Sequence, residues 1–203
     1  MKAMGRLCSL LVLLFSCVAA RAQVIEFESN GLKYLTLTRS GVTVMFAIMP
    51  NHLHEYGIIQ VAVSNGSAGP YVIKPEDFTF LRSDGVELRG APARTVVTML
   101  SQKGSASDVI HLVTSYESAV YGNSRLKSTN GYEQRRQSAL AMGSTKLKAM
   151  AAASALAFVQ TKLAPGESTD GAVFFLNENK PLGPGHLIVR TNTDVFDFVT
   201  DTP

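Results

Sequence analysis

Two histidines and two methionines lie close together in one short stretch of the chain. His52 and His54 are separated by one residue, and Met45 and Met49 precede them. Residues two apart on a β-strand share a face, and imidazole nitrogens with methionine thioethers suit copper. The four residues therefore support a copper-binding hypothesis. The competing interpretation is ordinary packing, because a Pro-Asn pair before His52 predicts a loop and the methionines fit the core of a strand.

No motif for covalent catalysis accompanies these residues. The stretch 66–69, Gly-Ser-Ala-Gly, lacks the G-x-S-x-G spacing of a nucleophile elbow, and His111 and His186 have no recognisable serine or acidic partner in the sequence. A glycine loop of the phosphate-binding type is also absent from the sequence. We therefore expect neither enzymatic activity nor a cofactor, although a site assembled from distant residues would escape motif analysis.

The clearest chemical signal is a basic stretch between residues 123 and 162. It contains one acidic residue, Glu133, and seven basic ones: Arg125, Lys127, Arg135, Arg136, Lys146, Lys148 and Lys162. We expect the first six of these basic residues to form a binding surface. Such segregated charge favours encounter with an anionic surface or with an acidic protein, including the acidic remainder of a second copy.

The net positive charge of the whole chain has a separate origin. A basic start, an apolar run from Leu7 to Val18, and small residues at Ala20 and Ala22 are the parts of a secretory signal peptide, residues 1–22. Its removal takes three of the 19 basic side chains and none of the 16 acidic ones, which leaves 16 of each. A balanced charge gives no reason to expect a nucleic-acid partner.

Both cysteines, Cys8 and Cys17, lie in this leader, so the remaining chain would have no disulfide and no thiolate metal ligand. We expect a periplasmic or secreted protein. The alternative is lipid anchoring at Cys17, because residues 14–17 resemble a lipobox, although Phe15 is bulkier than that pattern takes. The apolar run is too short to span a bilayer, so we expect no transmembrane segment.

Short apolar alternations predict β-strands from Val24 to about Leu100 and again from about Phe158 to the end. In the last of these strands Phe196 and Phe198 share one face, so we expect them to close the core.

Between the two β blocks, at about 101–157, the spacing predicts a two-helix insertion. The first helix starts at an N-cap, Ser107, and ends at Gly122; a polar loop follows, and a second helix of about 25 residues runs to the second β block, weakened at Gly143. The predicted packing face of this second helix is a stripe of six residues: Leu140, Gly143, Leu147, Met150, Ser154 and Ala157. The helix could cover the β domain, dock on a partner or a second copy, or lie on anionic lipid.

Two stretches of the chain resemble a widespread family of exported bacterial immunoglobulin-like domains of unknown function. The first, 58–88, carries an N-x-S turn, a later P-x-D-F strand and an Asp-Gly turn. The second, 162–175, carries L-x-P-G-E before an apolar strand. The matching positions are Val61, Val63, Asn65, Ser67, Pro70, Pro75, Asp77, Phe78, Leu81, Asp84, Gly85, Leu163, Pro165, Gly166, Glu167, Gly171, Val173 and Phe175.

The resemblance implies an antiparallel β-sandwich and leaves chemistry open, and the long helical insertion departs from the family pattern. We therefore expect one mainly β domain, residues 23–203, an immunoglobulin-like sandwich with a two-helix insertion before the closing strands. Its expected role is that of an exported, non-catalytic binding or structural module. The alternative is a periplasmic copper-binding protein that uses Met45, Met49, His52 and His54.

Overall fold

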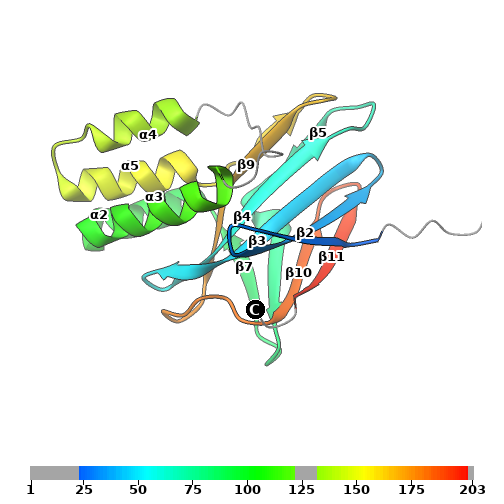
Figure 1. Ribbon diagram of the computed structural model, residues 1–203, viewed down its shortest axis with the longest axis horizontal. Helices are drawn as coiled ribbons and strands as arrows, with labels where there is room; N and C mark the ends of the chain where they lie inside the picture. Colours follow the sequence, from blue (N-terminus) through cyan, green and yellow to red (C-terminus); the bar gives the residue numbers. More distant parts are fainter. Residues whose placement is uncertain (1–22, 122–131, 201–203) are drawn as a thin grey trace, which may run out of the picture.

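The computed structural model describes residues 23–121 and 132–200 (Figure 1). Within these ranges the chain is mainly β, with a group of helices on one side of the strands. The predicted signal peptide, 1–22, and the predicted polar loop, 123–131, lie outside the described residues.

One large antiparallel sheet has the strand order β1-β2-β3-β4-β9-β7-β6-β10-β11. This sheet curls, because β11 at one end of the strand order also contacts β2 near the other end. A separate two-stranded ribbon joins β5 and β8. The strand bounds are β1 Ile25–Ser29, β2 Leu32–Arg39, β3 Val42–Leu53, β4 Tyr56–Asn65, β5 Tyr71–Ile73, β6 Phe78–Arg82, β7 Glu87–Ala91, β8 Thr161–Leu163, β9 Ser168–Leu176, β10 Gly185–Arg190 and β11 Val195–Thr200.

The curled sheet encloses an apolar core rich in phenylalanine. Phe46 of β3 meets Phe198 of β11 edge to face, with ring centroids 5.0 Å apart. Phe196 and Phe198 are both fully buried while Asp197 between them is exposed, which confirms their predicted role in closing the core. Full burial of a phenylalanine side chain contributes about 1.5–3 kcal/mol, so this cluster is a main source of stability.

A second apolar core lies between the sheet and the helices. Val96 and Leu112 of the helices pack with Tyr34, Met49 and Phe174 of the sheet. The helices are α2 (Ala93–Lys103), α3 (Ala106–Tyr121), α4 (Tyr132–Leu140) and α5 (Thr145–Leu156), and in Figure 1 they lie side by side at one end of the molecule. Residues of α2, α3 and α5 belong to this core, so these helices cover one face of the sheet.

The helical region starts earlier than predicted, at Ala93 instead of residue 101. Val96, Val97 and Thr98 are β-branched and favour a strand by type, which hides the helix in the sequence. Val96 and Leu100 are nevertheless four residues apart and both fully buried, as on one face of a helix. Tertiary burial of this face overrides the local β propensity.

The second predicted helix is wrong as a continuous element, because the chain forms a helical hairpin from α4 and α5. The break spans residues 141–144, where Ser144 takes an extended conformation (φ −93°, ψ 137°) before α5 begins. The predicted packing stripe is also displaced: Leu147 is 49 % exposed, while the buried face of α5 consists of smaller residues. These are Ala149, Ala152, Ala153, Ala155 and Leu156.

The passage from α5 back into the sheet needs a glycine. Phe158 N donates to Ala172 O at 2.8 Å, which draws the chain after α5 onto β9. A Cβ at Gly171 would lie 2.7 Å from the backbone of Phe158. Only glycine allows this approach, and the approach fixes the end of the helical layer on the sheet.

Candidate functional site

The histidine and methionine residues of the copper hypothesis lie in different environments. Met45 and Met49 belong to the core between sheet and helices, with Met49 buried and Met45 half-buried. His52 is exposed on β3, which continues through the predicted loop to Leu53 with an irregularity between Ile48 and His52. The loop prediction is wrong because β3 and β4 continue to pair beyond that irregularity.

His54 has a partner of its own. Its Nε2 lies 3.1 Å from Oδ2 of Asp108, a residue of the first turn of α3. Within the described residues, no group of three or more His, Cys, Asp or Glu side chains is placed to hold a metal ion.

Ser105, Asp108 and His54 form a serine-acid-histidine group, but the order of the contacts is not that of a nucleophile. Ser105 Oγ donates to Asp108 Oδ2 at 2.8 Å, and Ser105 N donates to the same oxygen at 2.7 Å. Asp108 N donates to Ser105 Oγ at 3.3 Å. The hydroxyl thus contacts the acid and not the base, and the group caps α3 from Ser105, two residues before the predicted cap.

The two stretches that carry the family resemblance meet in space at Asn65. This side chain is fully buried, and its Nδ2 donates to Gly69 O at 2.8 Å and to Leu163 O at 3.1 Å. Its Oδ1 accepts from Ser67 N and Ser67 Oγ at 3.0 and 2.6 Å. Its backbone N donates to Glu167 O at 2.9 Å. The motif residues therefore build a turn junction, in which the amide of Asn65 is engaged and inaccessible.

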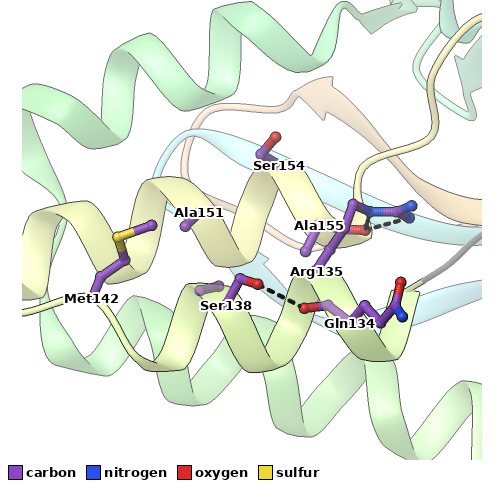
Figure 2. Close-up of a pocket in the computed structure, with 8 residues that line it drawn as sticks. Gln134, Arg135, Ser138, Met142, Ala151, Ser154 and Ala155 are labelled. Carbon is purple, nitrogen blue, oxygen red and sulfur yellow. Dashed lines mark hydrogen bonds between the residues drawn. The ribbon is translucent and has the colours of Figure 1, made fainter.

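The helical hairpin carries a groove between α4 and α5 (Figure 2). Its volume is about 290 Å³, and Met142 points across it towards Ala151. The lining combines an apolar floor with polar edges: Gln134, Arg135, Ser138, Ala139, Met142, Ala151, Ser154 and Ala155. We call this the hairpin groove.

Arg135 lies at one end of the hairpin groove and fixes α4 to α5. Its Nε and Nη2 donate to the carbonyl oxygen of Ala155 at 3.3 and 3.0 Å. This carbonyl lies in the last turn of α5, where helix carbonyls lack an intrahelical donor, so a guanidinium is a favourable partner. α4 packs chiefly on α5, and Ala139 is a buried side chain on its inner face.

A larger cavity of about 520 Å³ adjoins the hairpin groove, and Arg135 and Ser154 line both. Its remaining walls come from the segment after α5, from β8 and from the start of β9: Ala157, Val159, Thr161, Leu163, Glu167, Ser168, Thr169 and Asp170. Glu167 itself accepts from Ala164 N at 2.7 Å. The two cavities share Arg135 and Ser154 in their linings and together form a depression between the hairpin and the start of β9.

Within the described residues, the structure brings one of the predicted binding residues, Arg135, to the lining of this depression. Arg135 lines both cavities, while Lys146 is exposed and Lys148 half-exposed on α5. Arg136 lies on α4, and its side chain is outside the described part of the structure. Arg125 and Lys127 also lie outside the described residues.

Exposed apolar side chains surround the hairpin turn. Leu140, Met142 and Leu147 are 37 %, 41 % and 49 % exposed. These three residues fall within eight positions of sequence, so the turn gathers exposed apolar surface. The predicted packing stripe included Leu140 and Leu147, so their role as surface was not foreseen.

Comparison with protein-family models, with curated proteins and with solved structures finds no match to this chain. None of the helices in the described ranges has the length and apolar character that a membrane span requires.

Proposed function

We propose that this chain is an exported, non-catalytic binding module on an immunoglobulin-like β-sandwich, with the helical hairpin α4–α5 as its contact surface. Export rests on the signal-peptide pattern of residues 1–22. The immunoglobulin-like assignment draws support from the curled antiparallel sheet and from the junction of both motif stretches at Asn65.

The observation that carries the contact surface is the depression that continues from the hairpin groove past Arg135 and Ser154 to β9. Concave surface with an apolar floor and a few polar groups is typical of binding sites. The same hairpin also combines a basic excess with exposed leucine and methionine. Residues 132–156 hold four basic side chains and one acidic one, whereas the described remainder of the chain holds ten basic and fourteen acidic side chains.

A measurement of complex size in the native host tests this function. The full chain is compared with the double variant Lys146→Glu/Lys148→Glu and with the matched control Arg89→Glu/Lys180→Glu, which reverses two exposed charges on the sheet side. After chemical cross-linking in cells, wild type and control are expected in a complex larger than the free chain. The hairpin variant is expected at the size of the free chain. Equal complexes for all three proteins, or free chain for all three, would contradict the assignment.

A further inference from the structure

We infer that the hairpin groove binds an acidic, amphipathic helix of a partner protein, which places its apolar face on Met142 and the groove floor. The inference rests on the proposed function and adds the chemistry of the partner.

The walls of the groove decide between a helix and an extended strand. Both walls are α-helices, and the backbone groups within them are already engaged in intrahelical hydrogen bonds. Strand addition needs a row of open backbone donors and acceptors, which helical walls lack. Side chains must therefore supply the affinity, and a helix that presents apolar residues every three or four positions is the partner geometry that fits.

The floor of the groove fits apolar anchors of moderate size. Ala139, Ala151 and Ala155 leave a space of about 290 Å³ without large side chains to fill it. Met142 at its edge is unbranched and polarisable, so it can adjust to differently shaped anchors. Leu140 and Leu147 extend the apolar surface beyond the groove at the hairpin turn.

The basic excess of the hairpin favours an acidic partner. Arg135 lines the groove, Lys146 and Lys148 are exposed or half-exposed on α5, and the hairpin sequence 132–156 holds four basic residues against one acidic residue. Exposed charges act over a Debye length of about 8 Å at physiological salt, which is comparable with the width of a helix. A basic partner helix would be repelled and an acidic one attracted, and the attraction would raise the rate of association.

A membrane surface fits these observations less well. Interfacial helices place a convex apolar face into lipid, often with tryptophan or phenylalanine. Here the apolar floor lies in a shallow groove between two helices, and the chain has no tryptophan. The groove therefore favours a protein partner, and binding to vesicles becomes an outcome that the test can separate.

The test uses a fluorescent synthetic helix of about five turns, with leucine at every third and fourth position and glutamate elsewhere. One control peptide carries lysine in place of glutamate, and another scatters the leucines around the helix. Fluorescence anisotropy with the full chain is expected to give a dissociation constant of about 10–100 μM for the acidic peptide alone. A rise in salt concentration from about 50 to 500 mM is expected to weaken binding at least ~10-fold.

Two variants locate the binding. Ala151→Phe fills the groove and is expected to weaken binding of the acidic peptide at least ~10-fold. Ala106→Phe, at an exposed position of α3, should leave this affinity unchanged. Circular dichroism and thermal unfolding establish that both variants fold. Lys146→Glu/Lys148→Glu should reduce affinity similarly.

Equal binding of the acidic and lysine peptides, no binding of either, or binding to anionic vesicles in place of the peptide would overturn the inference. If the peptide fails while Lys146→Glu/Lys148→Glu still dissolves the complex in cells, the hairpin remains the contact surface and only the helical partner is wrong. If both experiments fail, the proposed function fails as well.

Discussion

Nε2 of His54 lies 3.1 Å from Oδ2 of Asp108, and this contact joins the turn between β3 and β4 to the first turn of α3. Asp108 is largely buried and at the same time accepts two hydrogen bonds from Ser105. One carboxylate thus caps a helix and attaches it to the sheet. The helical layer is held by specific polar contacts as well as by apolar burial.

Replacement of His54 by alanine is expected to lower the free energy of unfolding by about 1 kcal/mol, because one hydrogen bond to a buried carboxylate is lost. Asp108→Ala should cost more, about 2–3 kcal/mol, since it also removes the cap of α3. Urea denaturation measures both values. His52→Ala, at an exposed position of β3, is the matched control and should change stability by less than about 0.5 kcal/mol. Equal effects at His52 and His54 would show that the contact does not form.

The helical layer should unfold together with the sheet, because the two share one apolar core. Leu112 is buried against that core while Ile110, two residues earlier on α3, is 62 % exposed. Leu112→Ala is expected to lower the free energy of unfolding by about 2–5 kcal/mol. Strand and helix signals should still report one common transition, with its midpoint lowered. Ile110→Ala should have little effect. A variant that loses helix signal in a separate, earlier transition would show that the layer is an independent unit.

Asn65 should be among the polar residues on which stability depends most. Its side chain makes four hydrogen bonds that join two distant turns, and each contributes about 1 kcal/mol. Asn65→Ala is expected to cost about 3 kcal/mol in thermal or urea unfolding, and Ser67→Ala about 1 kcal/mol. A loss of less than about 1 kcal/mol for Asn65→Ala would contradict this, because it would mean that water molecules can take the place of the hydrogen bonds of Asn65.

Alkaline unfolding should report on Tyr34. Burial raises the pKa of its phenol from 10.0 to about 12, so the unfolded chain ionises at lower pH than the folded one. Its stabilising effect is complete below pH 10 and is lost as pH rises through about 12, by roughly 3 kcal/mol. Tyr34→Phe keeps the ring stacked on Phe27, at a centroid distance of 5.2 Å, and should flatten the decline of stability above pH 10. An unchanged profile would contradict the burial of this phenol.

The strands were predictable because their apolar alternation matches the side of the sheet that is buried. Phe196 and Phe198 illustrate this, since both are buried while Asp197 between them is exposed. The helices were less predictable from the sequence. Val96, Val97 and Thr98 have strand propensity, and they are helical because α2 packs on the sheet. In α5, alanines lie on several sides of the helix. The sequence alone therefore does not reveal which of them are buried.

The basic excess of the hairpin could be seen in the sequence, but the shape of the hairpin could not. The excess of arginine and lysine is visible in sequence, and Arg135 does line the depression. The groove itself arises from the reversal of the chain between α4 and α5, which places Met142 opposite Ala151. A prediction of one continuous helix separates these residues along the helix axis, so the groove could not be foreseen.

The most direct measurement of the central claim, that the hairpin is the contact surface, is site-specific photo-cross-linking in the native host. A photoreactive phenylalanine derivative is placed at Ser138, on the hairpin groove, and in a second protein at Lys180, on the exposed loop between β9 and β10. We predict a discrete adduct from Ser138 that is lost with Lys146→Glu/Lys148→Glu, and none from Lys180. An adduct from Lys180 together with no adduct from Ser138 would contradict the account.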